Sequence, residues 1–432
     1  MQQEAFLFGA AYYPEHRPAE RWEYDLDMMA GAAVNALRVG EFAWKRFEPE
    51  DERYALDWMV EFGELAWQRR IGLLLCPPLR TVPAWLVAKD PSVKLENEQG
   101  IRLEFGSRYS FCINHPWLRE RAIRLAEVMG QRFGGAPYLV GWHLDNEYGD
   151  EPDCHCPICR ERFQEWLRRQ YGSIETLNVA WGNVFWGLEY SGFEQVPTPR
   201  RSKTVHNPGH LQAWRTFRSE CNVEIIRLHA QAVQRAGGTQ PITTNFQTWN
   251  HRTDYYPAAK HLDVCGTNFY PPYGKPWTYE YALANARSYR QQNFQVHELR
   301  NSAHAIPGAS GNTPAPGEVQ RLTMHTVAHG ADAIYYFAWR GVEFGPEQTH
   351  GTITDYDGRP RRVYAEVKET GENLRRIWPM LRGTTVVSKV ATLHDLPTTW
   401  VMETDSDWVG DRGLYNEHYA RVRRAVRKLH VR

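Results

Sequence analysis

Short apolar segments alternate with longer amphipathic segments along most of this 432-residue chain. The short segments have the length and composition typical of strands, and they lie at 6–11, 35–40, 71–76, 138–144, 241–246, 262–269, 294–298 and 332–338. The longer segments repeat their apolar residues at helical spacing, at 22–33, 56–68, 118–132, 212–235, 277–291 and 317–329. This alternation predicts an α/β fold with a parallel sheet, and the order of the strands fits a closed (β/α)8 TIM barrel.

A doubly wound open sheet is the alternative architecture for alternating strands and helices. Such a fold holds phosphate groups at a glycine-rich loop that follows its first strand. No loop of that kind follows residues 6–11, so the closed barrel is favoured and no organic cofactor is expected.

The sequence pattern changes at about residue 382. We therefore expect a catalytic barrel over residues 1–381 and the start of a small α/β domain, partial or truncated, over residues 382–432. Within this second part, 384–393 is predicted to be a strand and 415–429 a basic amphipathic helix. One strand and one helix cannot cover their own apolar faces, so such a domain would need completion by further chain or by a partner.

The overall charge of the chain excludes several classes of partner. The 51 basic and 51 acidic residues balance, so no basic field favours nucleic acid. No segment has the length and apolarity of a membrane span, and the N-terminus lacks the pattern of a signal peptide, which predicts a cytoplasmic protein. The expected partner is a neutral small molecule or a second copy of the chain. The 17 Trp and 22 Tyr residues fit either a large core or a sugar site.

Polar residues gather at the predicted ends of the strands, where a barrel of this kind places its catalytic groups. Two of them are glutamates: Glu147 ends the fourth strand and Glu298 ends the seventh. A closed barrel brings these distant positions face to face across its mouth. Retaining glycoside cleavage uses two carboxyl groups about 5–5.5 Å apart, one giving a proton to the leaving oxygen and one attacking the anomeric carbon. The pair therefore predicts a retaining glycosidase.

Structural roles remain as alternatives for both glutamates. Glu147 could cap the strand or form a salt bridge, and Glu298 could form a buried ion pair with Arg300. The abrupt change from an apolar strand to three polar residues at 145–147 favours catalysis for Glu147. Asn146 beside it could bond a sugar hydroxyl next to the reacting carbon.

A cluster of cysteines follows Glu147. Of seven cysteines, Cys154, Cys156 and Cys159 lie within six residues, and the Cys-Pro-Ile-Cys part has the spacing of a zinc site. A fourth ligand must come from elsewhere, and Cys112 and His155 are the two candidates. A closed set of four thiolates leaves no position for water, so the predicted Zn²⁺ is structural. Reduced free thiols or a redox pair are the alternatives.

Many segments of the chain resemble glycoside hydrolase family 42, the barrel β-galactosidases. The matching segments are 40–44 (GEFAW) with 48–49 (EP), 83–86 (PAWL), 105–108 (FGSR), 141–149 (GWHLDNEYG), 244–246 (TNF), 262–264 (LDV) with 270–271 (YP), and 328–332 (AHGAD). The resemblance implies an exo-acting retaining β-galactosidase that works by double displacement, with Glu147 as acid/base and Glu298 as nucleophile. It also supports Cys112 as a zinc ligand, and it implies a homo-oligomer because family members are commonly trimers.

The resemblance also implies which residues hold the galactose. Arg108 and Asn146 match residues that contact the sugar, and Glu347 and His350 match an acidic residue and a histidine three positions apart that bind its hydroxyls. The family usually has an Asn-Trp pair after the nucleophile, but residues 298–306 read ELRNSAHAI and contain no Trp. We expect Trp339 to supply the missing ring.

Three other functions are also compatible with the sequence. The nearest is an α-L-arabinopyranosidase or β-D-fucosidase of the same barrel type, because these sugars share the ring hydroxyls of galactose. A non-catalytic sugar-binding barrel is a second alternative, and loss of one carboxylate would mark it. A zinc hydrolase is the third, and it would need an open metal position at the mouth of the barrel.

Overall fold

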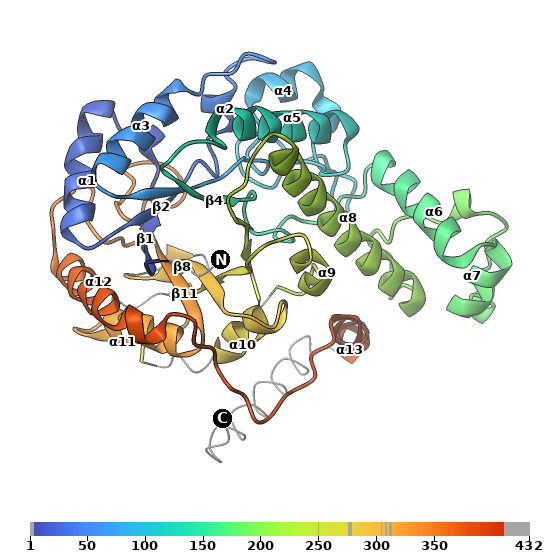
Figure 1. Cartoon of the computed structure of the whole chain (residues 1–432). Coiled ribbons are helices and arrows are strands. Elements are labelled where there is room, and N and C mark those ends of the chain that lie inside the picture. Colours follow the sequence, from blue (N-terminus) through green and yellow to red (C-terminus); the bar gives the residue numbers. More distant parts are fainter. Residues whose placement is uncertain are drawn as a thin grey trace.

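The computed structural model describes residues 4–409 except 249, 275–278, 304, 307–308 and 311–312. Parallel strands form its centre, and helices surround them (Figure 1). The central strands are β1 Leu7–Ala11, β2 Ala36–Val39, β3 Gly72–Leu75, β4 Leu139–His143, β5 Ile242–Thr243, β6 Asn245–Phe246, β7 Gly266–Phe269, β8 Phe294–Arg300 and β11 Ala331–Phe337. Two further strands, β9 Ala305–Ile306 and β10 Ala309–Ser310, pair with each other as a hairpin.

The sheet closes into a barrel at Thr244. The strand order is β5-β4-β3-β2-β1-β11-β8-β7-β6, so β5 and β6 stand at its two ends. These two strands are halves of one segment, interrupted only at Thr244, and they pair with β4 on one side and β7 on the other. Counting them as one gives the eight strands that a (β/α)8 barrel requires.

One helix follows each strand of the barrel. These helices are α1 Trp22–Gly31, α3 Asp57–Gln68, α5 Pro116–Phe133, α8 Pro208–Arg235, α9 Tyr255–Ala259, α10 Glu280–Ser288, α11 Glu318–Ala328 and α12 Arg362–Leu381. α5 shows why such segments are helical: Pro116 begins it, and Leu118, Leu125 and Met129 repeat at helical spacing and are buried. The main core lies between the sheet and this ring of helices.

The fold predicted from the sequence is confirmed. Each predicted strand of the barrel overlaps an observed one, and the predicted helices overlap α1, α3, α5, α8, α10 and α11. Among the described residues, no helix combines the length and the apolarity needed to cross a membrane.

Further helices lie outside the ring. α2 Trp44–Phe47 follows β2, and α4 Ala84–Lys89 follows β3. α6 Pro157–Tyr171 and α7 Ile174–Trp181 form an excursion between β4 and α8 that projects to one side of the barrel (Figure 1). A separate aromatic core holds this excursion against α8, and it includes the cysteines Cys112, Cys156 and Cys159.

The segment after α12 differs from the prediction. The expected strand at 384–393 is wrong, because this segment forms no strand and leads instead into α13 Leu396–Val409. α13 packs against α8, where the buried Trp400 donates its indole N–H to the carbonyl of His251. The predicted helix at 415–429 lies outside the described residues. The division of the chain at residue 382 therefore stays a prediction.

Gly9 gives a direct test of the barrel interior. A Cβ atom at Gly9 would lie 1.7 Å from the backbone oxygen of Ala36 on the neighbouring strand, and no side-chain movement can relieve that clash. We expect Gly9→Ala to lower the free energy of unfolding by about 3 kcal/mol or more. Gly135→Ala is the control, because a Cβ there meets nothing within 4 Å. Urea unfolding measures both, and equal stability of the two variants would contradict this packing.

Candidate active site

A strained turn places Glu147 above the end of β4. Asp145 and Glu147 have φ angles of 44° and 47°, in the left-handed region that residues with a side chain rarely adopt. The Asp145 carboxylate holds the turn, because it accepts from the backbone N–H groups of Leu79 and Arg80 at 2.8 Å each. The Arg80 guanidinium also lies 2.7 Å from that carboxylate. Strain of this kind is typical of functional sites.

A β-bulge places Glu298 in the mouth of the barrel. Strand alternation would put Glu298 on the same face as Phe294 and Val296, which are buried in the outer core. The pairing of β8 with β7 and with β11 shifts by one residue at this point, so one extra residue of β8 is accommodated around His297. The shift turns Glu298 inward, as bulges near active sites do.

The side chain of Asn245 links the two glutamates. Its Oδ1 accepts from the backbone N–H of Glu147 at 2.9 Å, and its Nδ2 donates to Oε1 of Glu298 at 3.1 Å. Nδ2 also donates to Oδ1 of Asn146 at 2.6 Å. The structure therefore brings the two glutamates, predicted from distant parts of the sequence, into one buried network.

Neutral donors surround the carboxyl group of Glu147. Asn268 donates to Oε1 at 2.6 Å, and both Asn146 and the hydroxyl of Tyr109 donate to Oε2 at 3.2 Å. Burial, and next the negative charge of Glu298, raises the pKa of Glu147 to about 7. This carboxyl group therefore holds a proton at a pH where an ordinary glutamate is ionised.

A buried cation contacts Glu298. Nη2 of Arg38 lies 2.7 Å from Oε1, and the hydroxyl of Tyr270 donates to Oε2 at 2.5 Å. Arg38 also lies 2.7 Å from the carboxylate of Glu41, which in turn accepts from the hydroxyl of Tyr13. A negative charge on Glu298 is therefore matched directly by a positive one.

The residues expected to bind the sugar lie over the same end of the barrel. The guanidinium of Arg108 lies 5.0 Å from the ring centre of Tyr109. It also lies 3.6 Å from the carboxylate of Glu347, and this ion pair connects the loop after β3 with the loop after β11. The ring of His350 lies 5.6 Å from that of Phe337 at the end of β11. Burial lowers the pKa of His350, so it is neutral at pH 7.

Trp339 needs a correction. It is 0% exposed, belongs to the outer core and packs edge-on against Tyr364 of α12 at 6.0 Å between ring centres. A ring enclosed in this way has no face for a sugar, so the expected role of Trp339 is wrong. Phe337 is a partly exposed aromatic residue on the same strand end and lies beside His350.

Some residues of the site were not assigned a role from the sequence. Asn245, Asn268 and Tyr270 lie at or next to strand ends, and no motif separates them from the other polar residues there. Arg38 carries a signal in the sequence, since a charged residue interrupts the otherwise apolar strand β2. Tyr109 lies in an irregular loop, and no periodicity or spacing marks it.

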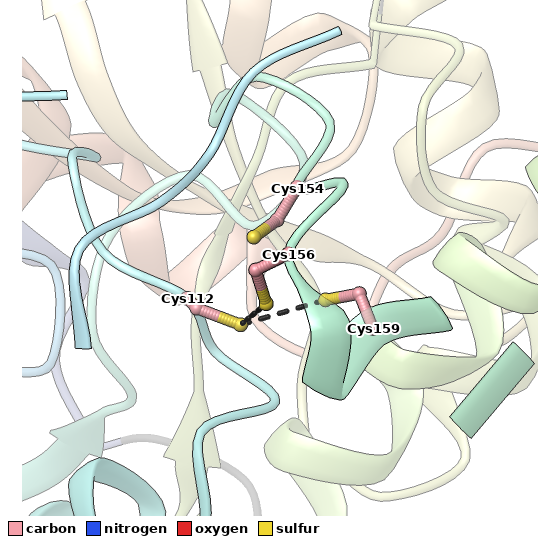
Figure 2. A group of neighbouring side chains, drawn as sticks. All are labelled: Cys112, Cys154, Cys156 and Cys159. Carbon is pink, nitrogen blue, oxygen red and sulfur yellow. Dashed lines mark hydrogen bonds between the residues drawn. The ribbon is translucent and has the colours of Figure 1, made fainter. Parts of the chain in front are cut away.

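The four predicted cysteine ligands come together in the structure (Figure 2). One sulfur from each of Cys112, Cys154, Cys156 and Cys159 lies within 4.8 Å of the others. The Cys112 sulfur is 3.5 Å from that of Cys159 and 3.7 Å from that of Cys156. Tetrahedral zinc with bonds of about 2.3 Å sets its sulfurs about 3.8 Å apart, so this cluster can hold a metal ion. His155, the competing ligand, stacks on Trp214 instead.

Comparison with known proteins gives consistent results for sequence and structure. The β-galactosidase BgaH of Haloferax lucentense is 32% identical, over 93% of this chain and 62% of its own length. The β-galactosidase Bga of Halorubrum lacusprofundi is 34% identical, over 91% and 58%. The solved structure of the Halorubrum lacusprofundi enzyme superimposes with a TM-score of 0.88 at 32% identity, covering 92% of this chain and 62% of that one.

The chain thus spans about three fifths of the length of these relatives. Residues 11–377, which include most of the barrel and both glutamates, match the family described as Beta-galactosidase, glycoside hydrolase 42. That match covers far more than half of the chain, and the barrel and its strand-end carboxyl groups agree with it. This chain therefore belongs to glycoside hydrolase family 42.

Proposed function

We propose that this chain removes terminal β-D-galactose from β-galactosides with retention of configuration. The observation that carries the proposal is the pair of buried glutamates, Glu147 and Glu298, which one asparagine side chain links across the barrel mouth. Their surroundings differ in the way that double displacement requires. One carboxyl group lies among neutral donors and the other contacts a cation.

The proposed roles follow from that difference. Glu298 attacks the anomeric carbon, and Arg38 matches its charge in the free enzyme. Glu147, whose raised pKa lets it hold a proton, protonates the leaving oxygen. In the second step Glu147 accepts a proton from water, which hydrolyses the bond between the sugar and Glu298.

The proposed galactose contacts are Arg108, Asn146, Glu347 and His350. Each lies at the end of the barrel where the two glutamates lie, and Arg108 and Glu347 already contact each other. These side chains offer both donors and acceptors, which suits a sugar with several hydroxyl groups. Phe337 is proposed in place of Trp339 as an apolar ring in this site.

Two rival functions can be distinguished from a β-galactosidase. An α-L-arabinopyranosidase or β-D-fucosidase would share the chemistry and differ at carbon 5 of the sugar, so a panel of 4-nitrophenyl glycosides separates them. A non-catalytic sugar-binding barrel would have lost a carboxylate, whereas both are present here together with their hydrogen-bond donors.

We propose that the cysteine cluster holds structural Zn²⁺. The four sulfurs fit a closed tetrahedral site, which leaves no position for a reactive water. Cys112 lies in the same loop as Arg108 and Tyr109, and Cys154 follows Glu147 by seven residues. The metal would therefore hold together the two loops that carry the acid/base and a sugar ligand.

We also propose a cytoplasmic location, which rests on the sequence pattern, and a homo-oligomer, which rests on the family.

Replacing either glutamate tests the roles. We expect Glu147→Gln and Glu298→Gln each to lower turnover of an alkyl galactoside roughly 100-fold to 10,000-fold. With 2,4-dinitrophenyl galactoside, whose leaving group departs without a proton, Glu147→Gln should recover most of the first-step rate and Glu298→Gln should not. Pre-steady-state release of the phenol measures that step. Glu366→Gln on α12 is the control.

A 2-deoxy-2-fluoro-galactosyl fluoride should then label the wild-type protein covalently. Peptide mapping should place the sugar on Glu298. Labelling of another residue would overturn the assignment of the nucleophile, and near-normal turnover by Glu298→Gln would do the same.

The raised pKa of Glu147 sets an alkaline limit to activity. kcat/KM should fall as the pH rises through about 7, because Glu147 then loses the proton that it must donate. The charge of Asp150 also raises the pKa of Glu147. Asp150→Asn should therefore move the alkaline limb of the pH profile, where kcat/KM falls, to lower pH. The pH dependence of kcat/KM measures the shift, with the exposed Asp27→Asn as control. The role of Asp150 would be contradicted if Asp150→Asn left the alkaline limb unchanged or moved it to higher pH.

Loss of one cysteine tests the metal cluster. Cys112→Ser should lower the zinc content from about one ion per chain and reduce Tm by roughly 5 °C or more, because metal binding contributes to folding. Cys265→Ala, a buried cysteine outside the cluster, should keep its zinc. Atomic absorption and thermal unfolding measure both quantities, and unchanged zinc in Cys112→Ser would exclude Cys112 as a ligand.

A further inference from the structure

A second group of metal-type ligands lies on the outer layer of helices. Glu280 is the first residue of α10, while His325 and His329 lie one turn apart at the end of α11. One ligand atom from each of the three lies within 4.8 Å of the others. α10 and α11 are the helices before and after β8 in the chain, so the group connects two neighbours of the ring. All three residues are partly exposed, which gives an ion access from solvent.

The two histidines have the spacing of a helical metal site. Residues four apart on a helix share one face, and paired histidines at this spacing bind zinc in many proteins. The ring centres of His325 and His329 are 4.4 Å apart. Nδ1 of His329 lies 2.8 Å from the backbone oxygen of His325. A carbonyl only accepts, so Nδ1 carries the proton and Nε2 keeps its lone pair.

The hydrogen bond from His329 to a carbonyl is of the type that orients histidines in metal sites. A histidine ligand usually donates its second ring N–H to a carbonyl or carboxylate, which fixes both the tautomer and the direction of the ring. His329 has this arrangement without any metal. The opposing carboxylate is also in place, because Oε1 of Glu280 lies 3.3 Å from Nε2 of His325.

The nearby arginines are engaged by other acceptors. Arg321, one turn before the first histidine, lies 3.0 Å from the carboxylate of Glu318. Arg287 donates to the backbone oxygen of His329 at 3.2 Å and to the hydroxyl of Ser388 at 3.1 Å. These oxygens lie outside the cluster, which itself consists of two imidazoles and one carboxylate.

We propose that Glu280, His325 and His329 bind a divalent transition-metal ion on the outside of the barrel. Two imidazoles and one carboxylate suit Zn²⁺, Ni²⁺ or Cu²⁺, whereas Ca²⁺ and Mg²⁺ prefer oxygen ligands. Three protein ligands leave at least one coordination position for water. The ion would replace the contact between Glu280 and His325 with bonds from both side chains, and it would hold α10 and α11 together on the two sides of β8.

Nickel titration distinguishes this site from the cysteine cluster. The full chain is first given one equivalent of Zn²⁺, which the four thiolates of the cysteine cluster take up in preference to the helix site, and Ni²⁺ is then added in a calorimeter. We expect the wild-type protein to bind about one equivalent more Ni²⁺ than His325→Ala. Glu280→Gln, which keeps both imidazoles, should weaken that binding roughly tenfold. Ni²⁺ should also raise the Tm of the wild type and leave that of His325→Ala unchanged.

His261→Ala is the matched control, because His261 is also partly exposed but lies outside the cluster. It should bind Ni²⁺ as the wild type does. The Tm of each variant without added metal shows whether it is folded, and His329→Gln serves as the second variant if His325→Ala is not. The proposal would be overturned if the wild type, the folded histidine variant and Glu280→Gln all bound Ni²⁺ with equal stoichiometry and affinity. The contact between Glu280 and His325 would then be only an ion pair between the two helices. Galactoside turnover plays no part in this readout.

Discussion

The buried guanidinium of Arg38 is the charge on which the arrangement of the barrel mouth depends. It lies 2.7 Å from the carboxylates of both Glu41 and Glu298, within a part of the barrel that is closed to solvent. Two carboxylates buried side by side repel each other, and burial together with the charge of Glu298 raises the pKa of Glu41 to about 7 although Arg38 lowers it. Burial by itself lowers the pKa of Arg38, but these two carboxylates raise it above its usual value, so the cation persists. The position of the proposed nucleophile is therefore fixed by an ion pair inside the barrel.

The two glutamates differ in their surroundings, and Arg38 contributes to that difference. Arg38 contacts Glu298, whereas the hydrogen-bond partners of Glu147 are amides and a phenol hydroxyl. The same negative charge that Arg38 stabilises acts on Glu147 and helps to raise its pKa. Two chemically identical side chains thus lie in different surroundings, as an acid and a nucleophile in one site require.

The parts of the structure that depend on periodicity could be predicted from the sequence, and the parts that depend on local backbone geometry could not. Apolar alternation located the strands, and the segment around Glu147 marked a strand end. The inward direction of Glu298 depends on a bulge that alternation contradicts. Trp339 is predicted to supply the missing ring of the sugar site, but it is enclosed by the outer core. Arg38 shows the reverse case, since its isolated charge within β2 is visible in the sequence and its contact with the distant Glu298 is not.

The strained turn at Glu147 requires support on both sides, and a single loop supplies it. The guanidinium of Arg80, after β3, lies 2.7 Å from Asp145 and 2.9 Å from Glu151, one before and one after Glu147. Farther along the same loop, Tyr109 donates to Glu147, and Cys112 joins the cysteine cluster. The loops after β3 and β4 are thus connected by an ion-pair network, a hydrogen bond and the proposed metal site. A metal that takes no part in the chemistry would therefore still help to hold the proposed acid/base in place, because it would join the same two loops at a second point beyond the contacts of Arg80.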